Sequence, residues 1–576
     1  MTSDNRTLRP VTIWLTGISG SGKTTIANGV VAKLRSLGYN AVNLDGDKLR
    51  AGLNSDLGFS SKDRKENLRR TAEVATMFAG SNLLPVVSLI SPFKEDRALA
   101  RSIHHKKQID FLECFINTPV EECERRDPKG LYKKFRSGVI KNFTGIDAPY
   151  EIPENPDLVL STMDLNIEES IENVIRLLED KQCIQKRIIE LFTSSDLLPG
   201  IMERLNDDSA IARLNISRID LEWVQVLSEG WATPLTGFMR EVEYLECIHK
   251  GTIRGGLVNH TIPIVLSVCS VSDADKQRLE NKKEIGLWYE NKCFAEFFIH
   301  RKEERCAKIF GTTNIGHPTI KMIYESGDYL VGGDLSVLQK ITWEDGLDQY
   351  RLTPAELRTK FKRMGADAIY AFQLRNPIHN GHALLMQETK KQLLDKNCKN
   401  PVLLLHPLGG WTKEDDVPLK VRIEQHKAVL EAKVLDPEST VLAIFPSPMS
   451  YAGPVEVQWH CKARLVTGAN YYIVGRDPAG IQHPNGSDDL YDPSHGAKLL
   501  QIARGLSQFE VIPFKVAAYN LVKGCMEFYD PNEKDKFLFI SGTRMRALAR
   551  NGQTPPDGFM APKAWSVLRD FYQSQP

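Results

Sequence analysis

The sequence predicts an α/β protein of three domains, with a parallel-sheet domain first, a β-rich domain in the middle and a second α/β domain last. The chain has 576 residues, and at about 150 residues per domain this length suggests three or four separate cores. Short apolar runs also alternate with helix-like segments in the first and last parts of the chain, which is typical of parallel sheets with crossover helices. The expected boundaries are 1–180 for the first domain, 181–199 for a linker or linking helix, 200–345 for the second domain and 346–576 for the third.

Composition and charge exclude several classes of protein. Apolar residues make up 42 % and charged residues 26 % of the chain, close to the averages of globular proteins, so wholesale disorder is excluded. The 74 basic and 73 acidic side chains leave a formal net charge of +1, which argues against a nucleic-acid partner held by a broad basic surface. No apolar run reaches the ~18 residues of a membrane span, and the cysteines include no C-x-x-C pair. We therefore expect no nucleic-acid partner, no membrane partner, and reduced, mostly buried thiols.

Five apolar runs define the sheet of the first domain. They are short and are separated by segments with helical periodicity. Because a helix-length segment lies between successive runs, the strands should be parallel. The runs are Val11–Thr16, Ala41–Leu44, Leu84–Ile90, Phe111–Asn117 and Asp157–Leu160.

The middle region loses this regular alternation. Short runs such as Thr261–Val268 and Cys293–Ile299 are punctuated by turn signals up to about Trp343, which indicates a mixed, strand-rich domain. Strand–helix alternation returns after Thr353 and predicts the second α/β domain. Its strand candidates are Ala368–Phe372, Pro401–His406, Thr440–Phe445 and Tyr471–Val474.

The first candidate site follows the first predicted strand. Residues 17–24 read Gly-Ile-Ser-Gly-Ser-Gly-Lys-Thr and fit the pattern G-x-x-x-x-G-K-[ST], directly before a helical segment. In such a loop the glycines let backbone N–H groups face phosphates, the lysine reaches the β- and γ-phosphates, and the threonine hydroxyl can ligate Mg²⁺. We therefore predict a P-loop NTPase-type domain that binds ATP with Mg²⁺. The predicted ATP-binding residues are Gly20, Ser21, Gly22, Lys23, Thr24 and Thr25, with Thr24 as the metal ligand.

Two carboxylates lie at the end of the second predicted strand. Asp45 and Asp47 fall at the carboxyl edge of the sheet, where ligands bind in open α/β folds. One of them can accept the proton of an attacking hydroxyl, and either can help to hold Mg²⁺. The alternative interpretation is a solvated Asp-Gly turn.

Guanidinium groups are concentrated just after these carboxylates. Arg50, Arg64, Arg69 and Arg70 come in close succession, and because arginine binds phosphate or sulfate in a bidentate way, they favour an anionic acceptor. For Arg69 and Arg70 a solvated helix face is an equally good interpretation. Further on, the charged run at 125–134 is typical of a mobile lid that closes over phosphates.

These residues together resemble those of adenylylsulfate (APS) kinases over nearly all of residues 10–180. The matching segments include the P-loop, Asp45-Gly46-Asp47, Ile90-Ser91-Pro92-Phe93 and the segment 143–147. The resemblance implies transfer of the ATP γ-phosphate to the 3′-hydroxyl of APS, with Lys23, Asp45 and Asp47 as catalytic residues. In some bacterial relatives the serine that matches Ser91 is a phosphoenzyme site, although direct in-line transfer is physically simpler. The residues that would hold APS are Asp47, Arg50, Phe59, Arg64, Asn67, Ile90, Ser91, Lys129, Asn142 and Phe143, with Phe59 and Phe143 stacking on adenine.

The second candidate site follows the predicted strand Ala368–Phe372. Residues 373–382 read Gln-Leu-Arg-Asn-Pro-Ile-His-Asn-Gly-His and open a helix, so His379 and His382 lie on one face at its N-terminus. There the rings and the free N–H groups can stabilise negative charge on a triphosphate. Two histidines at this spacing are a weak signal alone, and a metal site would need a third ligand that the sequence does not supply. Two more segments, 475–480 and 540–546, place polar groups at a sheet edge and at another helix N-terminus.

These features resemble the nucleotidyltransferase superfamily, and more closely the ATP sulfurylases, over about residues 200–575. The resemblance implies that sulfate attacks the α-phosphate of ATP to give APS and pyrophosphate. It also implies a Rossmann-like nucleotidyltransferase domain preceded by the family's β-rich (PUA-like) domain at 200–345. Gln373, Arg375 and the backbone at Ala479 would hold sulfate, and the catalytic residues would be Arg375, Asn376, His379 and His382. The full ATP and sulfate set is Gln373, Leu374, Arg375, Asn376, His379, His382, Gly475, Arg476, Asp477, Pro478, Ala479 and Ala517.

The order of the two halves resembles the fused 3′-phosphoadenylylsulfate (PAPS) synthases of animals. This implies sulfate activation in two steps, with ATP, sulfate, APS and PAPS as ligands, Mg²⁺ as the cofactor bound with ATP, and a homodimer. Two alternatives stay open. One half can be catalytically silent and act as a regulatory or binding module. The H-x-G-H pair also fits a nucleotide-dependent enzyme of the tRNA-synthetase type, but the chain lacks the basic tract of such an enzyme.

The expected location is the cytoplasm. The first ten residues are polar and contain no apolar stretch of the signal-peptide type. Entry into the nucleus as well would need only a short basic stretch, such as Lys133-Lys134 with its neighbours.

Overall fold

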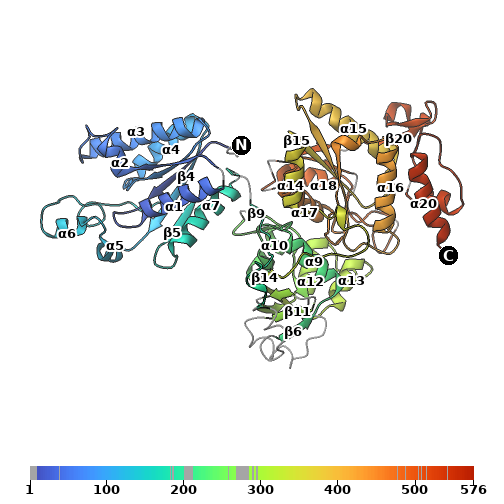
Figure 1. Cartoon of the computed structure of the whole chain (residues 1–576), viewed down its shortest axis with the longest axis horizontal. Coiled ribbons are helices and arrows are strands. Elements are labelled where there is room, and N and C mark those ends of the chain that lie inside the picture. Colours follow the sequence, from blue (N-terminus) through green and yellow to red (C-terminus); the bar gives the residue numbers. More distant parts are fainter. Residues whose placement is uncertain are drawn as a thin grey trace. The chain divides into compact units, whose positions relative to one another are not determined.

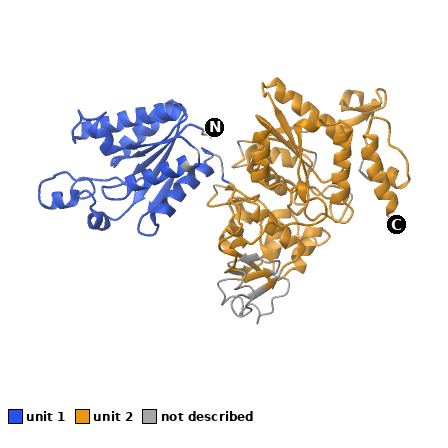
Figure 2. Ribbon diagram, in the orientation of Figure 1, with its two compact units in different colours: residues 1–187 blue, residues 188–576 orange. Residues whose placement is uncertain are grey.

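The protein folds into two compact units, residues 1–187 and 188–576 (Figure 2). None of the helices that the structure describes is long and apolar enough to cross a membrane. Eight cysteines are described as free thiols, and six of them are buried. The computed structural model describes residues 9–37, 39–181, 183–184, 187–199, 201, 212–256, 258–267, 285–288, 291–293, 296–475, 478–486, 488–503, 505–506, 509–513, 515–540 and 542–575.

The first unit contains one five-stranded sheet in which every pair of neighbours is parallel. The five predicted strands are all present, with ends that differ from the prediction by at most two residues. The strands are β1 (Val11–Thr16), β2 (Ala41–Asp45), β3 (Leu84–Ser88), β4 (Asp110–Asn117) and β5 (Leu158–Ser161). Their order across the sheet is β2-β3-β1-β4-β5, so β1 is central and carries the P-loop at its carboxyl end.

Helices cover both faces of this sheet (Figure 1). They are α1 (Lys23–Ser36), α2 (Gly46–Ala51), α3 (Ser61–Gly80), α4 (Lys94–Lys106), α5 (Val120–Arg126), α6 (Leu131–Arg136) and α7 (Ile167–Asp180). Alternate residues of β1 face opposite sides. Ile13 and Leu15 pack in the core with α1 and α7, whereas Trp14 packs with Leu68 and Ala72 of α3. The two cores hold the sheet edge, and therefore the P-loop, in place.

The predicted linking helix is not seen among the described residues of 187–195. The Leu191 N–H instead donates to the Ser228 carbonyl, and Phe192 forms a β-bridge with Val337. This stretch therefore packs with the second unit. The predicted domain boundaries themselves stay predictions.

The first part of the second unit is the expected strand-rich region. Its main sheet is mixed, because β11 and β6 are parallel while the other pairs are antiparallel. The strands are β6 (Ala212–Asn215), β7 (Gly237–Phe238), β10 (Leu266–Ser267), β11 (Ile285–Trp288), β12 (Asn291–Cys293), β13 (Glu296–Ile299) and β14 (Tyr329–Val337), beside a small pair, β8 (Thr252–Ile253) and β9 (Val258–Asn259).

Two predicted strands of this region are wrong in extent. The run 293–299 divides between β12 and β13, which both pair with the long strand β14. Only Leu266 and Ser267 of the run 261–268 pair as a strand, and Val268 lies outside the described residues. Short strands that pair with one long partner leave an apolar pattern that does not show where each strand ends.

The last part of the second unit contains a second parallel sheet, in the order β17-β16-β15-β18-β19. The four predicted strands are present, although β17 ends at Leu442, three residues before the predicted Phe445. The strand β19 and an antiparallel sheet of β20, β21 and β22 were not predicted. The strands are β15 (Ala368–Leu374), β16 (Pro401–Pro407), β17 (Thr440–Leu442), β18 (Tyr471–Val474), β19 (Glu510–Pro513), β20 (Ala517–Asn520), β21 (Cys525–Phe528) and β22 (Phe537–Leu538).

The helices of the second unit surround these sheets. They are α9 (Arg218–Ser228), α10 (Glu241–Lys250), α12 (Lys302–Phe310), α13 (Pro318–Glu325), α14 (Pro354–Arg363), α15 (Asn380–Asp395), α16 (Leu419–Glu431), α17 (Gly453–Val466), α18 (His495–Ile502), α19 (Gly542–Arg550) and α20 (Pro562–Ser574). The central strand β15 leads directly into α15, which again places a helix N-terminus at the carboxyl edge of a parallel sheet.

Candidate active sites

The P-loop depends on glycines at two close approaches. Gly17 and Gly20 have φ of +154° and +79°, which L side chains rarely adopt. A Cβ at Gly17 would lie 2.7 Å from the carbonyl oxygen of Ile116, and one at Gly20 would lie 2.9 Å from that of Cys123. The loop therefore stays thin, and its backbone N–H groups can approach a phosphate.

Lys23 opens α1, and its side chain folds back over the loop. Its Nζ donates to the Ile18 carbonyl at 2.7 Å and to the Ser21 hydroxyl at 3.4 Å. Burial lowers the pKa of Lys23 to about 8, although the nearby carboxylates of Asp47 and Asp45 act in the opposite direction. The ammonium is thus charged at neutral pH and has little water to lose before it meets a phosphate.

The two predicted carboxylates lie in different surroundings. Asp45 accepts hydrogen bonds from the hydroxyls of Thr24 at 2.8 Å and Ser88 at 2.9 Å, and from backbone N–H groups at the start of α2. Burial acts to raise the pKa of Asp45, but these hydrogen bonds outweigh it and lower the pKa. Asp47 is exposed and forms an ion pair with Lys129. Asp45 is therefore fixed beside the P-loop threonine, and Asp47 faces the basic segment.

One cavity of about 1450 Å³ gathers the predicted residues of the first unit. This volume exceeds the ~300–1,000 Å³ of a pocket for one small molecule, as a site for two nucleotides requires. The predicted residues that line it are Gly20, Gly22, Lys23, Thr24, Thr25, Asp45, Asp47, Arg50, Phe59, Arg64, Asn67, Ile90, Ser91, Lys129, Asn142 and Phe143. Ser21 is fully buried beneath the loop and does not line the cavity.

Arginine and aromatic side chains form one end of this cavity. The Arg50 guanidinium lies 4.5 Å above the centre of the Phe59 ring, which is 73 % exposed. Arg64 donates to the Phe59 carbonyl at 3.0 Å and to the Asn142 carbonyl at 3.3 Å, so it joins the start of α3 to the loop before β5. Phe143 packs edge-on against Tyr132 and is buried. A flat ring and guanidinium donors thus stand together, as an anionic nucleotide requires.

Arg69 and Arg70 lie outside this cavity. Arg69 pairs with Glu66 at 2.8 Å, and Arg70 pairs with Glu66 at 3.0 Å and with Asp56 at 2.8 Å. The solvated helix face is therefore the correct interpretation for these two arginines.

The charged segment 125–134 spans α5, α6 and the turn between them. Its two arginines form local ion pairs, because Arg125 and Arg126 both pair with Glu122. Tyr132 is buried, and its hydroxyl donates to the Ser19 carbonyl of the P-loop at 2.8 Å. The segment is thus joined to the phosphate loop by Tyr132 and to Asp47 by Lys129.

The sequence reasoning missed the cavity wall that follows β5. Residues there include Thr162, Leu165, Asn166 and Ile167. They come directly after a predicted parallel strand, so their place at the carboxyl edge of the sheet is a signal that could have found them.

The second site is built where β15 meets α15. The side chain of His379 caps the helix, because its Nδ1 accepts the Gly381 N–H at 3.1 Å. The rings of His379 and His382 stack with centroids 3.9 Å apart, and the Phe559 ring stacks with His379 at 5.4 Å. The two histidines therefore act as one stacked pair at a helix N-terminus.

Both histidines are neutral at ordinary pH. Desolvation lowers the pKa of His379 to about 4. Desolvation, with repulsion from His379 and His426, lowers the pKa of His382 well below its usual range. The rings can donate or accept hydrogen bonds, but the positive charge of the site comes from other groups.

A cavity of about 290 Å³ surrounds this pair, and it is lined by the predicted residues Arg375, Asn376, His379 and His382. Arg375 donates to the Gly480 carbonyl at 2.9 Å and lies 4.0 Å from the Asp416 carboxylate. The other predicted residues that are described do not line this cavity: they are Gln373, Leu374, Gly475, Pro478, Ala479 and Ala517. Arg476 and Asp477 lie outside the described residues.

Several lining residues were missed by the sequence reasoning. Lys413, Asp415 and Asp416 lie on the segment that follows β16, the strand next to β15, so the carboxyl edge of the sheet was again the available signal. Phe559 and Tyr572 come from the last part of the chain and had no local signal. Among the described residues, no group of three or more His, Cys, Asp or Glu side chains is arranged to hold a metal ion.

Comparison with known proteins assigns each part of the chain. Residues 9–161 match the adenylylsulphate kinase family, residues 185–340 the PUA-like domain and residues 348–571 the ATP-sulfurylase family. The predicted fold class, a P-loop parallel sheet followed by a β-rich domain and a second parallel-sheet domain, is confirmed.

Relatives and a solved structure agree with this order. ATP sulfurylase 2 of Arabidopsis thaliana is 52 % identical over 378 residues, which cover 64 % of this chain and 79 % of that protein. A probable bifunctional SAT/APS kinase 2 of Sorangium cellulosum is 31 % identical over 595 residues, which cover 98 % of this chain and 99 % of that protein. The hexameric APS kinase from Thiobacillus denitrificans has a TM-score of 0.50 at 17 % identity, over 68 % of this chain and 67 % of that chain, and shares the fold. The chain belongs to the bifunctional enzymes that carry an APS kinase and an ATP sulfurylase on one polypeptide.

Proposed function

We propose that the residues gathered in the two cavities carry out sulfate activation in two steps. In the second unit, a sulfate oxygen attacks the α-phosphorus of ATP, which gives APS and releases pyrophosphate. In the first unit, the 3′-hydroxyl of APS attacks the γ-phosphorus of a second ATP, which gives PAPS and ADP. The observation that carries this proposal is that most residues matched to the kinase line one cavity, and that Arg375, Asn376, His379 and His382, matched to the sulfurylase, line another.

In the kinase step, the P-loop and Lys23 hold the phosphates of ATP in line with the acceptor. Phosphoryl transfer needs positioning and charge stabilisation more than covalent chemistry, and the desolvated ammonium of Lys23 provides the latter. Arg50 and Arg64 at the far end of the cavity are matched to an acceptor that carries its own negative charge.

Thr24 and Asp45 have the chemistry that Mg²⁺ requires. Their hydroxyl and carboxylate oxygens are 2.8 Å apart beside the P-loop, and hard oxygen ligands are those that Mg²⁺ prefers. When bound with ATP, the cation neutralises charge on the β- and γ-phosphates. We assign Mg²⁺ to these two residues and leave Asp47 as the group that takes the proton of the attacking hydroxyl.

Ser91 is better suited to a structural part in the acceptor site than to a phosphoenzyme. Its hydroxyl is buried and accepts a hydrogen bond from the Trp14 indole N–H at 2.9 Å. A phosphate on this oxygen would have to displace the indole, so direct transfer from ATP to APS is the simpler route.

In the sulfurylase step, Arg375, Lys413 and Arg546 supply positive charge for sulfate and for the leaving pyrophosphate. The His379–His382 pair is neutral, and its ring N–H groups donate hydrogen bonds to phosphate oxygens. Neither ring has to lose a proton before it binds. We retain Gln373 and the backbone at Ala479 as predicted sulfate ligands.

The test is incubation of the protein with ATP, Mg²⁺ and radiolabelled sulfate, with pyrophosphatase present and with APS and PAPS separated by chromatography. Label should appear first in APS and then in PAPS. PAPS made only from supplied APS would mean that the sulfurylase half is a silent module. No sulfate-dependent release of pyrophosphate and no product from supplied APS would contradict the proposal as a whole.

We also propose a homodimer and a cytoplasmic, additionally nuclear, location. Both rest on the sequence reasoning above. Sedimentation at equilibrium and imaging of the tagged protein in cells are the measurements that test them.

A further inference from the structure

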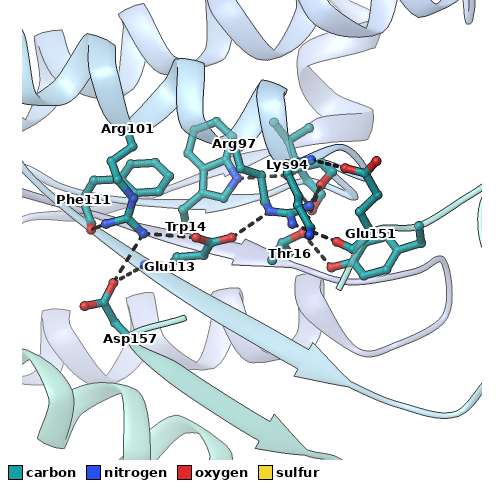
Figure 3. A network of polar contacts seen from close by, with 12 residues as sticks. Trp14, Thr16, Lys94, Arg97, Arg101, Phe111, Glu113, Glu151 and Asp157 are labelled. Carbon is teal, nitrogen blue, oxygen red and sulfur yellow. Dashed lines mark hydrogen bonds and ion pairs between the residues drawn. The ribbon is translucent and has the colours of Figure 1, made fainter. Parts of the chain in front are cut away.

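A buried ion pair lies behind the kinase cavity without lining it. Arg97 of α4 and Glu113 of β4 are 3 % and 7 % exposed, and the Arg97 Nε lies 2.8 Å from a Glu113 carboxylate oxygen (Figure 3). A buried pair of this kind is costly to desolvate, so stability alone is a weak reason to have one. Its other contacts point to the cavity.

The remaining nitrogens of Arg97 bind two loops. One donates to the Ser91 carbonyl at 2.7 Å and the other to the Glu151 carbonyl at 2.8 Å (Figure 3). The Glu151 N–H in turn donates to the Pro92 carbonyl at 2.8 Å. One guanidinium thus joins β4 to the segment Ile90–Pro92 and to the loop before β5.

The segment 90–92 needs such support because its backbone is strained. Ser91 has φ of +46°, in the left-handed region that favours glycine. Its hydroxyl is held by the Trp14 indole, and the Thr16 hydroxyl donates to the Ile90 carbonyl at 2.7 Å. Ile90 and Ser91 line the kinase cavity, so a relaxation of this backbone would move the cavity wall.

Glu113 also forms hydrogen bonds with two residues other than Arg97. Its second oxygen accepts from Arg101 at 3.1 Å, and its N–H donates to Asp157 at 3.0 Å (Figure 3). Arg101 is half exposed and contacts neither Ser91 nor Glu151 in any described interaction. Two arginines, Arg97 and Arg101, therefore pair with the Glu113 carboxylate. Of these two, Arg97 is the one described as bonding to a residue of the cavity wall, Ser91.

We propose that Arg97 is a positioning residue for APS: it holds Ile90 and Ser91 in the geometry that accepts the second nucleotide. This inference rests on the proposed kinase function and on the assignment of Ile90 and Ser91 to the APS site. Because the guanidinium is a planar fork, it bonds the carboxylate and both carbonyls at once. A lysine ammonium at this position keeps the charge beside Glu113 but cannot reproduce that geometry.

The test compares Arg97→Lys with Arg101→Lys in the full chain. KM and kcat are measured for APS and for ATP in the kinase reaction, and APS formation from sulfate is measured on the same samples as an internal control. Arg97→Lys should raise the KM for APS about tenfold, since a displaced positioning group weakens alignment of the bound substrate, and should change the KM for ATP by less than about twofold. Arg101→Lys should leave both KM values within about twofold of the wild type.

A second variant, Trp14→Phe, removes the donor to the Ser91 hydroxyl and keeps an aromatic ring, although the smaller ring also leaves space in the buried core. It should raise the KM for APS about threefold with the KM for ATP unchanged, in line with the loss of one hydrogen bond. An unchanged KM for APS in Arg97→Lys, or equal increases for both substrates, would overturn the inference. A wild-type chain that makes no PAPS from APS would instead contradict the proposed function, so the two failures are distinguishable.

Discussion

Lys23 and the His379–His382 pair both lie at the N-terminus of a helix that follows a central parallel strand, yet they differ in charge. With a pKa of about 8, Lys23 is protonated at neutral pH, whereas His379, with a pKa of about 4, is not. The kinase site therefore concentrates charge on its loop lysine. The cavity of the second unit is lined by Arg375, Lys413 and Arg546, which carry its positive charge, while its two histidines are neutral.

Two substitutions should separate the activities at this scale. Lys23→Met should lower PAPS formation from supplied APS by about 10²- to 10³-fold, because a charge-stabilising donor is lost, while APS formation from sulfate persists. His382→Asn should do the reverse. Both rates are read from the same chromatographic assay, and loss of both activities from either change would contradict independent sites.

At the scale of elements, the segment α5–α6 is attached to the rest of its unit by a small buried cluster, in which Cys123 and Tyr132 pack with Ile18 and Phe143, and by polar contacts such as that of Arg126 with the Thr162 hydroxyl at 3.1 Å. Its arginines are largely occupied by glutamates of the same segment, as in the pair of Arg136 with Glu124. The contacts described above that reach the P-loop side are those of Tyr132 and Lys129. The predicted lid would keep its own ion pairs when it moves, and it would break the contacts of Tyr132, Lys129 and Arg126 with the rest of the unit.

Tyr132→Phe tests this attachment. The change removes the hydroxyl that binds the Ser19 carbonyl and keeps the ring. The closed position of the segment α5–α6 should therefore lose about 1 kcal/mol of free energy, and the Kd for ATP should rise about fivefold. Calorimetric titration with a non-hydrolysable ATP analogue measures the Kd. The matched control is Tyr39→Phe, a buried tyrosine of the same unit outside the cavity, for which the Kd should stay within about twofold. Equal Kd values for the two variants would contradict a lid held by Tyr132.

At the scale of the whole molecule, the second unit buries many neutral histidines. Five fully or nearly fully buried ones have a pKa that desolvation lowers: His300, His317, His406, His426 and His460. In the first unit, burial likewise lowers the pKa of one described histidine, His104, to about 4. Two buried carboxyls, Glu222 and Glu229, act oppositely, because burial raises the pKa of each to about 7.

Acid should therefore destabilise the second unit. Between about pH 4.5 and 6.5 the unfolded histidines, His379 and His382 included, bind protons that the folded ones do not, whereas the two carboxyls bind more protons when folded. Because these histidines outnumber the two carboxyls, the free energy of unfolding should fall as the pH falls through this window. Tryptophan fluorescence during urea unfolding reports this, because seven of the eight tryptophans lie in residues 188–576. A urea midpoint that is unchanged from pH 7 to pH 5 would contradict the prediction.

Local patterns in the sequence were sufficient for much of the fold and for the centres of both sites. The five strands of the first sheet were predicted closely because buried strands are short apolar runs between helix-length segments, whereas β19 of the second parallel sheet was not predicted. Lys23, Thr24 and the His379–His382 pair were predicted because each site begins within a few residues of a strand end. The run 293–299 was predicted as one strand but is divided between β12 and β13, because pairing with β14 is not a local property of the sequence.

What the sequence determined by itself was the chemistry available at each sheet edge, because that depends on residue type and on spacing along one segment. Only the tertiary structure decided which groups meet. It separated Asp45 from Asp47, removed Arg69 and Arg70 from the cavity, and placed Lys413 and Tyr572 beside Arg375. The physical reason is that the order of strands in a sheet, β2-β3-β1-β4-β5 in the first unit, is set by packing between segments far apart in the chain. Through that order, Trp14 of β1 meets Ser91, which follows β3, although the two residues are far apart in the chain.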